Sequence, residues 1–273
     1  MQWITLFLAS CLTFCVIVKA KEDSYLGEFP WTVSLKLVGL FGHDCGGAIL
    51  NNVSLSLFGF KNKLYLDIDS FQSWVLTTAY CAQLNDEFDH PNFEVIAGIL
   101  DRNNDESGQI RHVEKAYVHP YFSSDQGSDI ALLKLDFPLE FNENVTAVHM
   151  AVDAEALEST FMDCTESGWS KEDKHPIMQK SPLILIDTEV CQEGASDGDK
   201  VPTTSFCAGN ESGATEMCPG YIGSPVTCME NDQPVLVGLQ SFTWECNAAN
   251  TPGIYTSIRS LRNWVEYTLE KEE

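Results

Sequence analysis

Two stretches decide the fold of this chain: Trp74-Val75-Leu76-Thr77-Thr78-Ala79-Tyr80-Cys81 and Cys218-Pro219-Gly220-Tyr221-Ile222-Gly223-Ser224-Pro225-Val226. Around them, short segments rich in Val, Ile, Leu, Phe and Tyr alternate with Gly, Pro, Asn and Asp, a pattern typical of β-strands. Examples of such segments are 31–37, 95–99, 130–135, 182–186 and 235–239. The sequence therefore predicts an all-β protein, with one exception at its carboxyl end.

The exception is a run of apolar residues with helical spacing. Ile258, Leu261, Val265 and Leu269 recur at intervals of three and four residues, and Ser257 precedes them as a candidate N-cap. This pattern predicts a terminal α-helix with one buried face.

The first twenty residues have the features of a secretory signal peptide. A mostly apolar run, 3–18, is followed by Val18-Lys19-Ala20, which predicts cleavage after Ala20. A membrane anchor is the alternative, but the run is short for a bilayer span. We expect a secreted, extracellular protein.

Cysteine number and charge narrow the function further. Two of the ten cysteines, Cys11 and Cys15, fall in the predicted signal peptide and leave eight, an even number that suits disulfides. Their spacing lacks the paired C-x-x-C pattern of structural zinc, so the sequence indicates no metal site and no cofactor. A net charge of −24 argues against nucleic acid and anionic membranes as partners. The charge favours solubility, with a cationic partner as the alternative.

The two opening stretches resemble motifs of the chymotrypsin-like (trypsin-like) serine proteases. The first is similar to W-V-L-T-A-A-H-C, which carries the catalytic histidine, and the second to C-x-G-D-S-G-G-P-[LV], which carries the nucleophile. Gly27-Glu28-Phe29-Pro30-Trp31-Thr32-Val33-Ser34-Leu35, Asp129-Ile130-Ala131-Leu132-Leu133-Lys134-Leu135 and Pro252-Gly253-Ile254-Tyr255-Thr256 resemble further family motifs, in the family's order. The resemblance implies one domain over residues 21–273, built from two six-stranded antiparallel β-barrels and a C-terminal α-helix, with the site in the cleft between the barrels.

The resemblance also places the catalytic triad at Tyr80, Asp129 and Ile222. Only the aspartate matches the family, because Tyr80 replaces the histidine and Ile222 replaces the serine. An isoleucine side chain cannot form an acyl-enzyme, and a phenol is a weak proton acceptor near neutral pH. The sequence thus predicts a pseudoenzyme, in which Asp129 accepts hydrogen bonds from Tyr80 and from its companion Ser241.

Residues near these positions do not offer a replacement nucleophile or base. Ser224 lies two residues after Ile222, and His43 corresponds to a structural histidine of the family. Tyr221 replaces the family's aspartate that pairs with a newly cut amino terminus, and the family's starting motif is missing. We therefore expect that the segment beginning at Lys21 does not insert to form the pair that the family's newly cut amino terminus makes with its aspartate.

The resemblance implies a specificity pocket and disulfides, and sequons predict glycosylation. The pocket positions are Glu216, Ser241, Phe242, Thr243 and Gly253, where Glu216 would attract Lys or Arg and Thr243 would narrow the entrance. The implied disulfides are Cys45–Cys81, Cys164–Cys228, Cys191–Cys207 and Cys218–Cys246. Sequons at Asn144 and Asn210 predict glycosylation of a secreted chain.

One segment, 53–72, departs from the family's spacing between Cys45 and Trp74. Its first two residues can be encoded by GTA-AGT and its last two by TTT-CAG, which match intron boundaries. We expect a retained intron, with a true loop insertion as the alternative.

Three hypotheses for function remain open. The first is a secreted, non-catalytic homologue that binds extracellular proteins, such as active proteases, their inhibitors or their substrates. The second is a serine-type endopeptidase with a non-standard catalytic site. The third is a chain under no functional selection, against which the coherent motifs and cysteines count.

Overall fold

A computed structural model describes residues 21–39, 42–51, 73–84, 92–123, 127–151, 162–171, 175–193, 200–210, 221–243 and 251–272. The predicted signal peptide and segment 53–72 lie outside these residues. Among the described residues, no helix combines the length and apolar character needed to cross a membrane.

The first barrel is a closed ring of six antiparallel strands. Its members are β2 (Thr32–Leu37), β3 (Cys45–Asn51), β4 (Trp74–Thr77), β5 (Phe93–Ala97), β6 (Gln109–Val118) and β7 (Ala131–Leu135). They pair in the order β3-β2-β5-β6-β7-β4, and β4 pairs with β3 to close the ring. Closure leaves no exposed sheet edge in this ring. Short helical turns follow β4 as α1 (Ala79–Ala82) and β5 as η3 (Asp105–Ser107).

The second barrel closes in the same way. Its members are β9 (Met162–Gly168), β10 (Gln179–Ile186), β11 (Ser205–Gly209), β12 (Pro225–Glu230), β13 (Gln233–Thr243) and β14 (Gly253–Ser257). They pair antiparallel in the order β12-β9-β10-β11-β14-β13, and β13 returns to β12. The short helix α2 (Thr188–Glu193) joins β10 to β11, and β1 (Glu22–Asp23) adds to the outside of β10.

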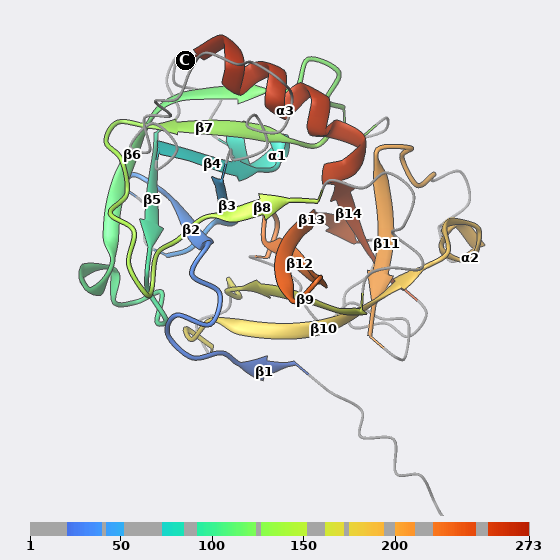
Figure 1. Cartoon of the computed structure of the whole chain (residues 1–273), viewed down its shortest axis with the longest axis horizontal. Helices are drawn as coiled ribbons and strands as arrows, with labels where there is room; N and C mark the ends of the chain where they lie inside the picture. Colours follow the sequence, from blue (N-terminus) through green and yellow to red (C-terminus); the bar gives the residue numbers. More distant parts are fainter. Residues whose placement is uncertain are drawn as a thin grey trace, which may run out of the picture.

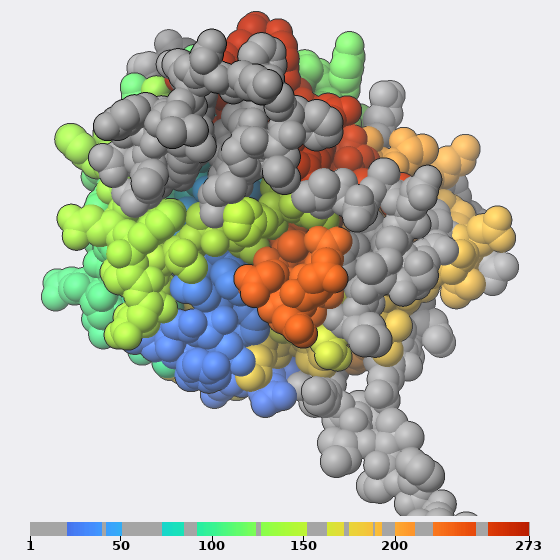
Figure 2. Space-filling view, in the orientation of Figure 1, coloured from blue at the N-terminus to red at the C-terminus, as the bar shows by residue number. Residues whose placement is uncertain are grey.

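A short strand joins the two barrels. β8 (Val148–Met150) pairs parallel with β3 of the first barrel and with β13 of the second (Figure 1). In Figure 2, the yellow-green chain around β8 crosses the surface from the blue strands to the orange hairpin of β12 and β13. The two-barrel prediction is thereby confirmed.

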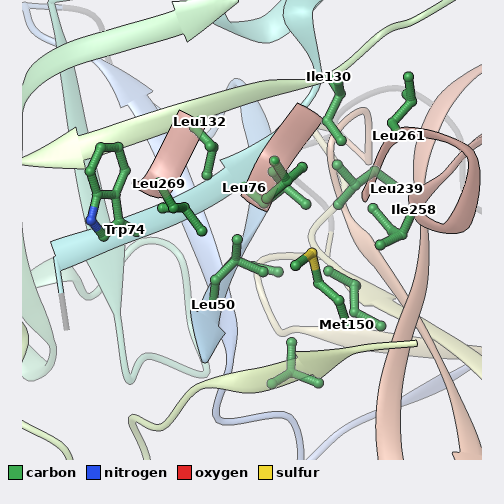
Figure 3. Packing of buried hydrophobic residues seen from close by; sticks show 14 of the residues in the cluster. Leu50, Trp74, Leu76, Ile130, Leu132, Met150, Leu239, Ile258, Leu261 and Leu269 are labelled. Atoms are coloured by element: carbon green, nitrogen blue, oxygen red, sulfur yellow. The ribbon is translucent and has the colours of Figure 1, made fainter. Parts of the chain in front are cut away.

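The predicted terminal helix is also confirmed. It is α3 (Ile258–Glu272), and Ser257 caps it because its Oγ accepts the Ser260 N–H at 3.3 Å. All four apolar residues with helical spacing are buried. Figure 3 shows Leu269 beside Leu76 of the first barrel and Ile258 and Leu261 beside Leu239 of the second, all in one buried cluster. The helix therefore covers the joint between the barrels, where β8 also lies.

Candidate functional site

A capped turn positions Tyr80. After β4 ends, the Oγ1 of Thr78 accepts the Cys81 N–H at 3.3 Å and starts α1. Cys81 is tied by a disulfide to Cys45 of β3. The backbone is thus fixed on both sides, while the Tyr80 side chain points outward and is 48% exposed.

Asp129 lies two residues before β7 and is buried. Its Oδ1 accepts the backbone N–H of Tyr80 at 2.8 Å, and its Oδ2 accepts the hydroxyl of Ser241 at 2.6 Å. Burial raises the pKa of the Asp129 carboxyl, and the hydrogen bonds from Ser241, Tyr80 and Ala79 oppose that rise. The two expected partners are therefore present, although Tyr80 contributes its backbone amide and leaves its phenol unconstrained by this bond.

Ile222 sits in a tight turn, Tyr221–Ser224. The Ser224 N–H donates to the Tyr221 carbonyl at 2.8 Å, and Gly223 adopts a φ of +84°. Only glycine fits at position 223, because a Cβ there would also collide with the carbonyl of Gly46. The Ile222 carbonyl accepts the Gly46 N–H at 2.8 Å, and its side chain packs against the first barrel's core.

Tyr80, Asp129 and Ile222, which the sequence resemblance predicts at the triad positions, meet at one cavity of about 260 Å³. Tyr80, Phe122, Pro202, Ile222 and Phe242 supply its apolar lining, and Ser123, Gly127, Asp129, Ser205 and Ser241 complete it. Apolar cavities with a few polar groups are the usual form of binding sites. Sequence reasoning missed Phe122, Pro202 and Ser205, since they come from loops or strand ends that carry no motif.

The neighbouring serine and histidine do not line this cavity. Ser224 is fully buried, and its Oγ packs against Gly46 and Gly168. His43 is also buried, with its Nδ1 2.8 Å from the Ser34 Oγ. Both residues therefore lie within the packed scaffold.

The expected specificity pocket is described only in part. Ser241 and Phe242 line the cavity, whereas Thr243 and Gly253 pair with each other in β13 and β14, outside its lining. Glu216 lies outside the described residues. Within the described ranges, no group of three or more His, Cys, Asp or Glu is placed to hold a metal ion.

Three of the four implied disulfides are present: Cys45–Cys81, Cys164–Cys228 and Cys191–Cys207. Cys218 and Cys246 lie outside the described residues. The two sequon asparagines are both half-buried, Asn144 in a turn after β7 and Asn210 just after β11. Their glycosylation stays a prediction.

The amino-terminal segment also reaches this region, which we had not expected. The Lys21 ammonium lies 4.8 Å from the centre of the Tyr221 ring, next to the turn that carries Ile222. The contact uses a lysine side chain, which the sequence motifs gave no reason to place there.

Comparison with known proteins agrees with this architecture. The family model described as Trypsin matches residues 70–265. Ovochymase from Halocynthia roretzi is 27% identical over 247 residues, which cover 88% of this chain and 14% of Ovochymase. Coagulation factor XI from Bos taurus is 27% identical over 259 residues, which cover 92% of this chain and 37% of factor XI. This chain thus spans well under half the length of either relative. Because the family model matches most of the chain, and the two closed barrels are the fold that its motifs imply, the chain belongs to the trypsin family.

Proposed function

We propose that this chain is a secreted, non-catalytic member of the trypsin family that acts by binding an extracellular protein in the cavity between its barrels. The observation that carries the proposal is the lining of that cavity. Tyr80 and Ile222 stand at its wall where acyl transfer needs a base and a nucleophile. An alkyl group has no lone pair with which to attack a carbonyl, and a phenol accepts a proton poorly near neutral pH.

The same lining suits a binding role. Phe122, Ile222 and Phe242 offer apolar surface, and the half-exposed Tyr80 extends it toward solvent. An apolar side chain of a partner would gain about 1.5–3 kcal/mol from full burial in such a cavity. The disulfides fit an oxidising, extracellular compartment.

An active protease, a protease inhibitor or a protease substrate is the partner class we propose. Such proteins present extended segments that a trypsin-family cleft is shaped to receive. The similarity to coagulation factor XI fits a role as cofactor or decoy beside a protease cascade.

The test is a paired capture from the native extracellular fluid. Wild-type protein and a Ser205→Phe variant, whose new ring fills the cavity, are used as baits. A Tyr267→Ala variant is the matched control, because Tyr267 is 56% exposed on α3 and does not line the cavity. We expect one partner to bind wild type and Tyr267→Ala and to be lost from Ser205→Phe.

An activity measurement separates binding from proteolysis. Purified wild-type protein is incubated with a fluorophosphonate probe and with peptide substrates. We expect no labelled serine and no cleavage above a trace, since binding alone can leave a residual rate. Labelling of a single serine, together with cleavage that the reagent abolishes, would instead favour the endopeptidase hypothesis.

A further inference from the structure

The amino-terminal segment Lys21–Ser24 is anchored along the second barrel. In β1, Glu22 lies opposite Lys180 and Asp23 opposite Gln179. Ser24 then donates both its N–H and its hydroxyl to the Met178 carbonyl, each at 2.9 Å. Figure 1 shows β1 beneath β10, on the outside of the barrel. The segment is therefore held by its backbone next to the start of β10.

One buried side chain connects this segment to the turn that carries Ile222. The Nε2 of Gln179 donates to the Asp23 carboxylate at 3.3 Å, while its Oε1 accepts the Tyr221 hydroxyl at 2.8 Å. Gln179 and Tyr221 are 7% and 1% exposed. Buried polar groups hold each other in fixed positions because an unmade hydrogen bond is costly. Movement of β1 would thus disturb Tyr221.

Lys21 makes a second connection to the same turn. Its ammonium lies over the Tyr221 ring, and its positive charge also acts on the carboxyl of Glu166 in β9. Glu166 is fully buried; its Oε2 accepts the Tyr255 hydroxyl at 3.0 Å, and its Oε1 has no hydrogen-bond partner. A buried carboxyl with one unsatisfied oxygen gains from a nearby cation.

We propose that Lys21–Ser24 is a latch, in which the Lys21 ammonium, held over the Tyr221 ring, locks β1 to the second barrel and fixes the turn Tyr221–Ser224. The turn in turn sets the cavity wall, since Ile222 lies between Tyr221 and Gly223. The latch works through a lysine side chain and acts whether the cavity binds a partner or cleaves one. Its test is therefore independent of the proposed function.

The test is hydrogen–deuterium exchange on the folded protein. The Lys21→Met variant keeps most of the side-chain length and removes the charge. At pH 9, where the Glu166 carboxyl is ionised, we expect the amides of Ser24, Gly223 and Ser224 to exchange roughly threefold to tenfold faster, from the loss of one cation–π contact and one charge interaction. Amides that pair β2 with β5 in the first barrel should keep their rates.

Three further substitutions make the test specific. Lys180→Met removes another cation from the same strand pair. The Lys180 ammonium lies 2.6 Å from the Glu28 carboxylate, and in the sheet Lys180 lies opposite Glu22. It should leave the Gly223 and Ser224 amides unchanged, and Lys21→Arg should restore wild-type exchange. At pH 9, where the Glu166 carboxyl is ionised, Lys21→Met should have a smaller effect in a Glu166→Gln background than in wild type, because one of the two partners of Lys21 has lost its charge.

Three results would overturn the latch. One is unchanged exchange at Gly223 and Ser224 in Lys21→Met. Another is an equal change in Lys180→Met, which would mean that the strand pair responds to any lost cation. The third is full additivity of Lys21→Met and Glu166→Gln, which would show that the two residues do not interact.

Discussion

Glu166→Gln should remove a large pH dependence from the stability of this protein. Burial raises the pKa of the Glu166 carboxyl from 4.5 to about 8, although the Tyr255 hydrogen bond and the Lys21 charge both act to lower it. Glutamine has nearly the same shape and still accepts the Tyr255 hydroxyl. The substitution therefore removes the titration while leaving the packing in place.

Whether the free energy of unfolding rises or falls with pH depends on which state, folded or unfolded, holds the proton. Between pH 4.5 and about 8, the folded protein keeps a proton on Glu166 that the unfolded chain has released. The free energy of unfolding must then fall as pH rises through this window and level off above it. At 1.36 kcal/mol per pKa unit, the full fall due to Glu166 is about 5 kcal/mol.

Guanidinium titrations at half-unit steps from pH 4.5 to 9, with disulfides intact, would measure this fall. The useful quantity is the difference between wild type and Glu166→Gln, because other carboxyl groups titrate in both proteins. That difference should move by several kcal/mol in favour of the variant as pH rises. Glu189→Gln, at an exposed residue of α2, is the matched control and should run parallel to wild type. Parallel curves for wild type and Glu166→Gln would refute the argument from burial.

Two further substitutions test the scaffold. Asp129→Asn should lower the free energy of unfolding by about 1–3 kcal/mol, because an amide cannot accept both the Tyr80 N–H and the Ser241 hydroxyl as the carboxylate does. Chemical denaturation checks this value, and a loss no larger than that of Ser241→Ala would contradict it. Leu261→Ala should cost about 2–5 kcal/mol, because the side chain is 5% exposed in the core under α3. Tyr267→Ala on the exposed face of the same helix should stay within about 0.5 kcal/mol, and equal losses from the two would contradict the packing.

The strands and the terminal helix were predictable because their signals are local, whereas their closure into two barrels was predicted from the family resemblance. A strand that faces a core needs apolar residues, and segments such as 130–135 and 235–239 supply them to β7 and β13. The helix was predicted by the spacing of Ile258, Leu261, Val265 and Leu269. These features need no knowledge of distant contacts.

Other features depend on contacts between distant residues. β8 has only three residues, and its parallel pairing with β3 and β13 has no sequence signature. Lys21 and Glu166 are far apart in the chain, so only the folded barrel brings the cation near the carboxyl. A signal was available in Glu166 itself, since a lone carboxyl between Cys164 and Gly168 is unusual in a strand that closes a barrel.

The contacts around Tyr80 and Ile222 explain how the fold accommodates these two side chains. Asp129 binds the backbone amide of Tyr80, and Gly46 binds the backbone carbonyl of Ile222. Neither interaction uses the side chain at the position where the family has its base or its nucleophile. Backbone groups are the same for every residue except proline, so these hydrogen bonds survive replacement of the reactive side chains. Chemistry and scaffold are therefore separable at this site under the proposed function: a tyrosine at position 80 and an isoleucine at position 222 leave Asp129 buried, Gly223 in its turn and the cavity open between the two barrels.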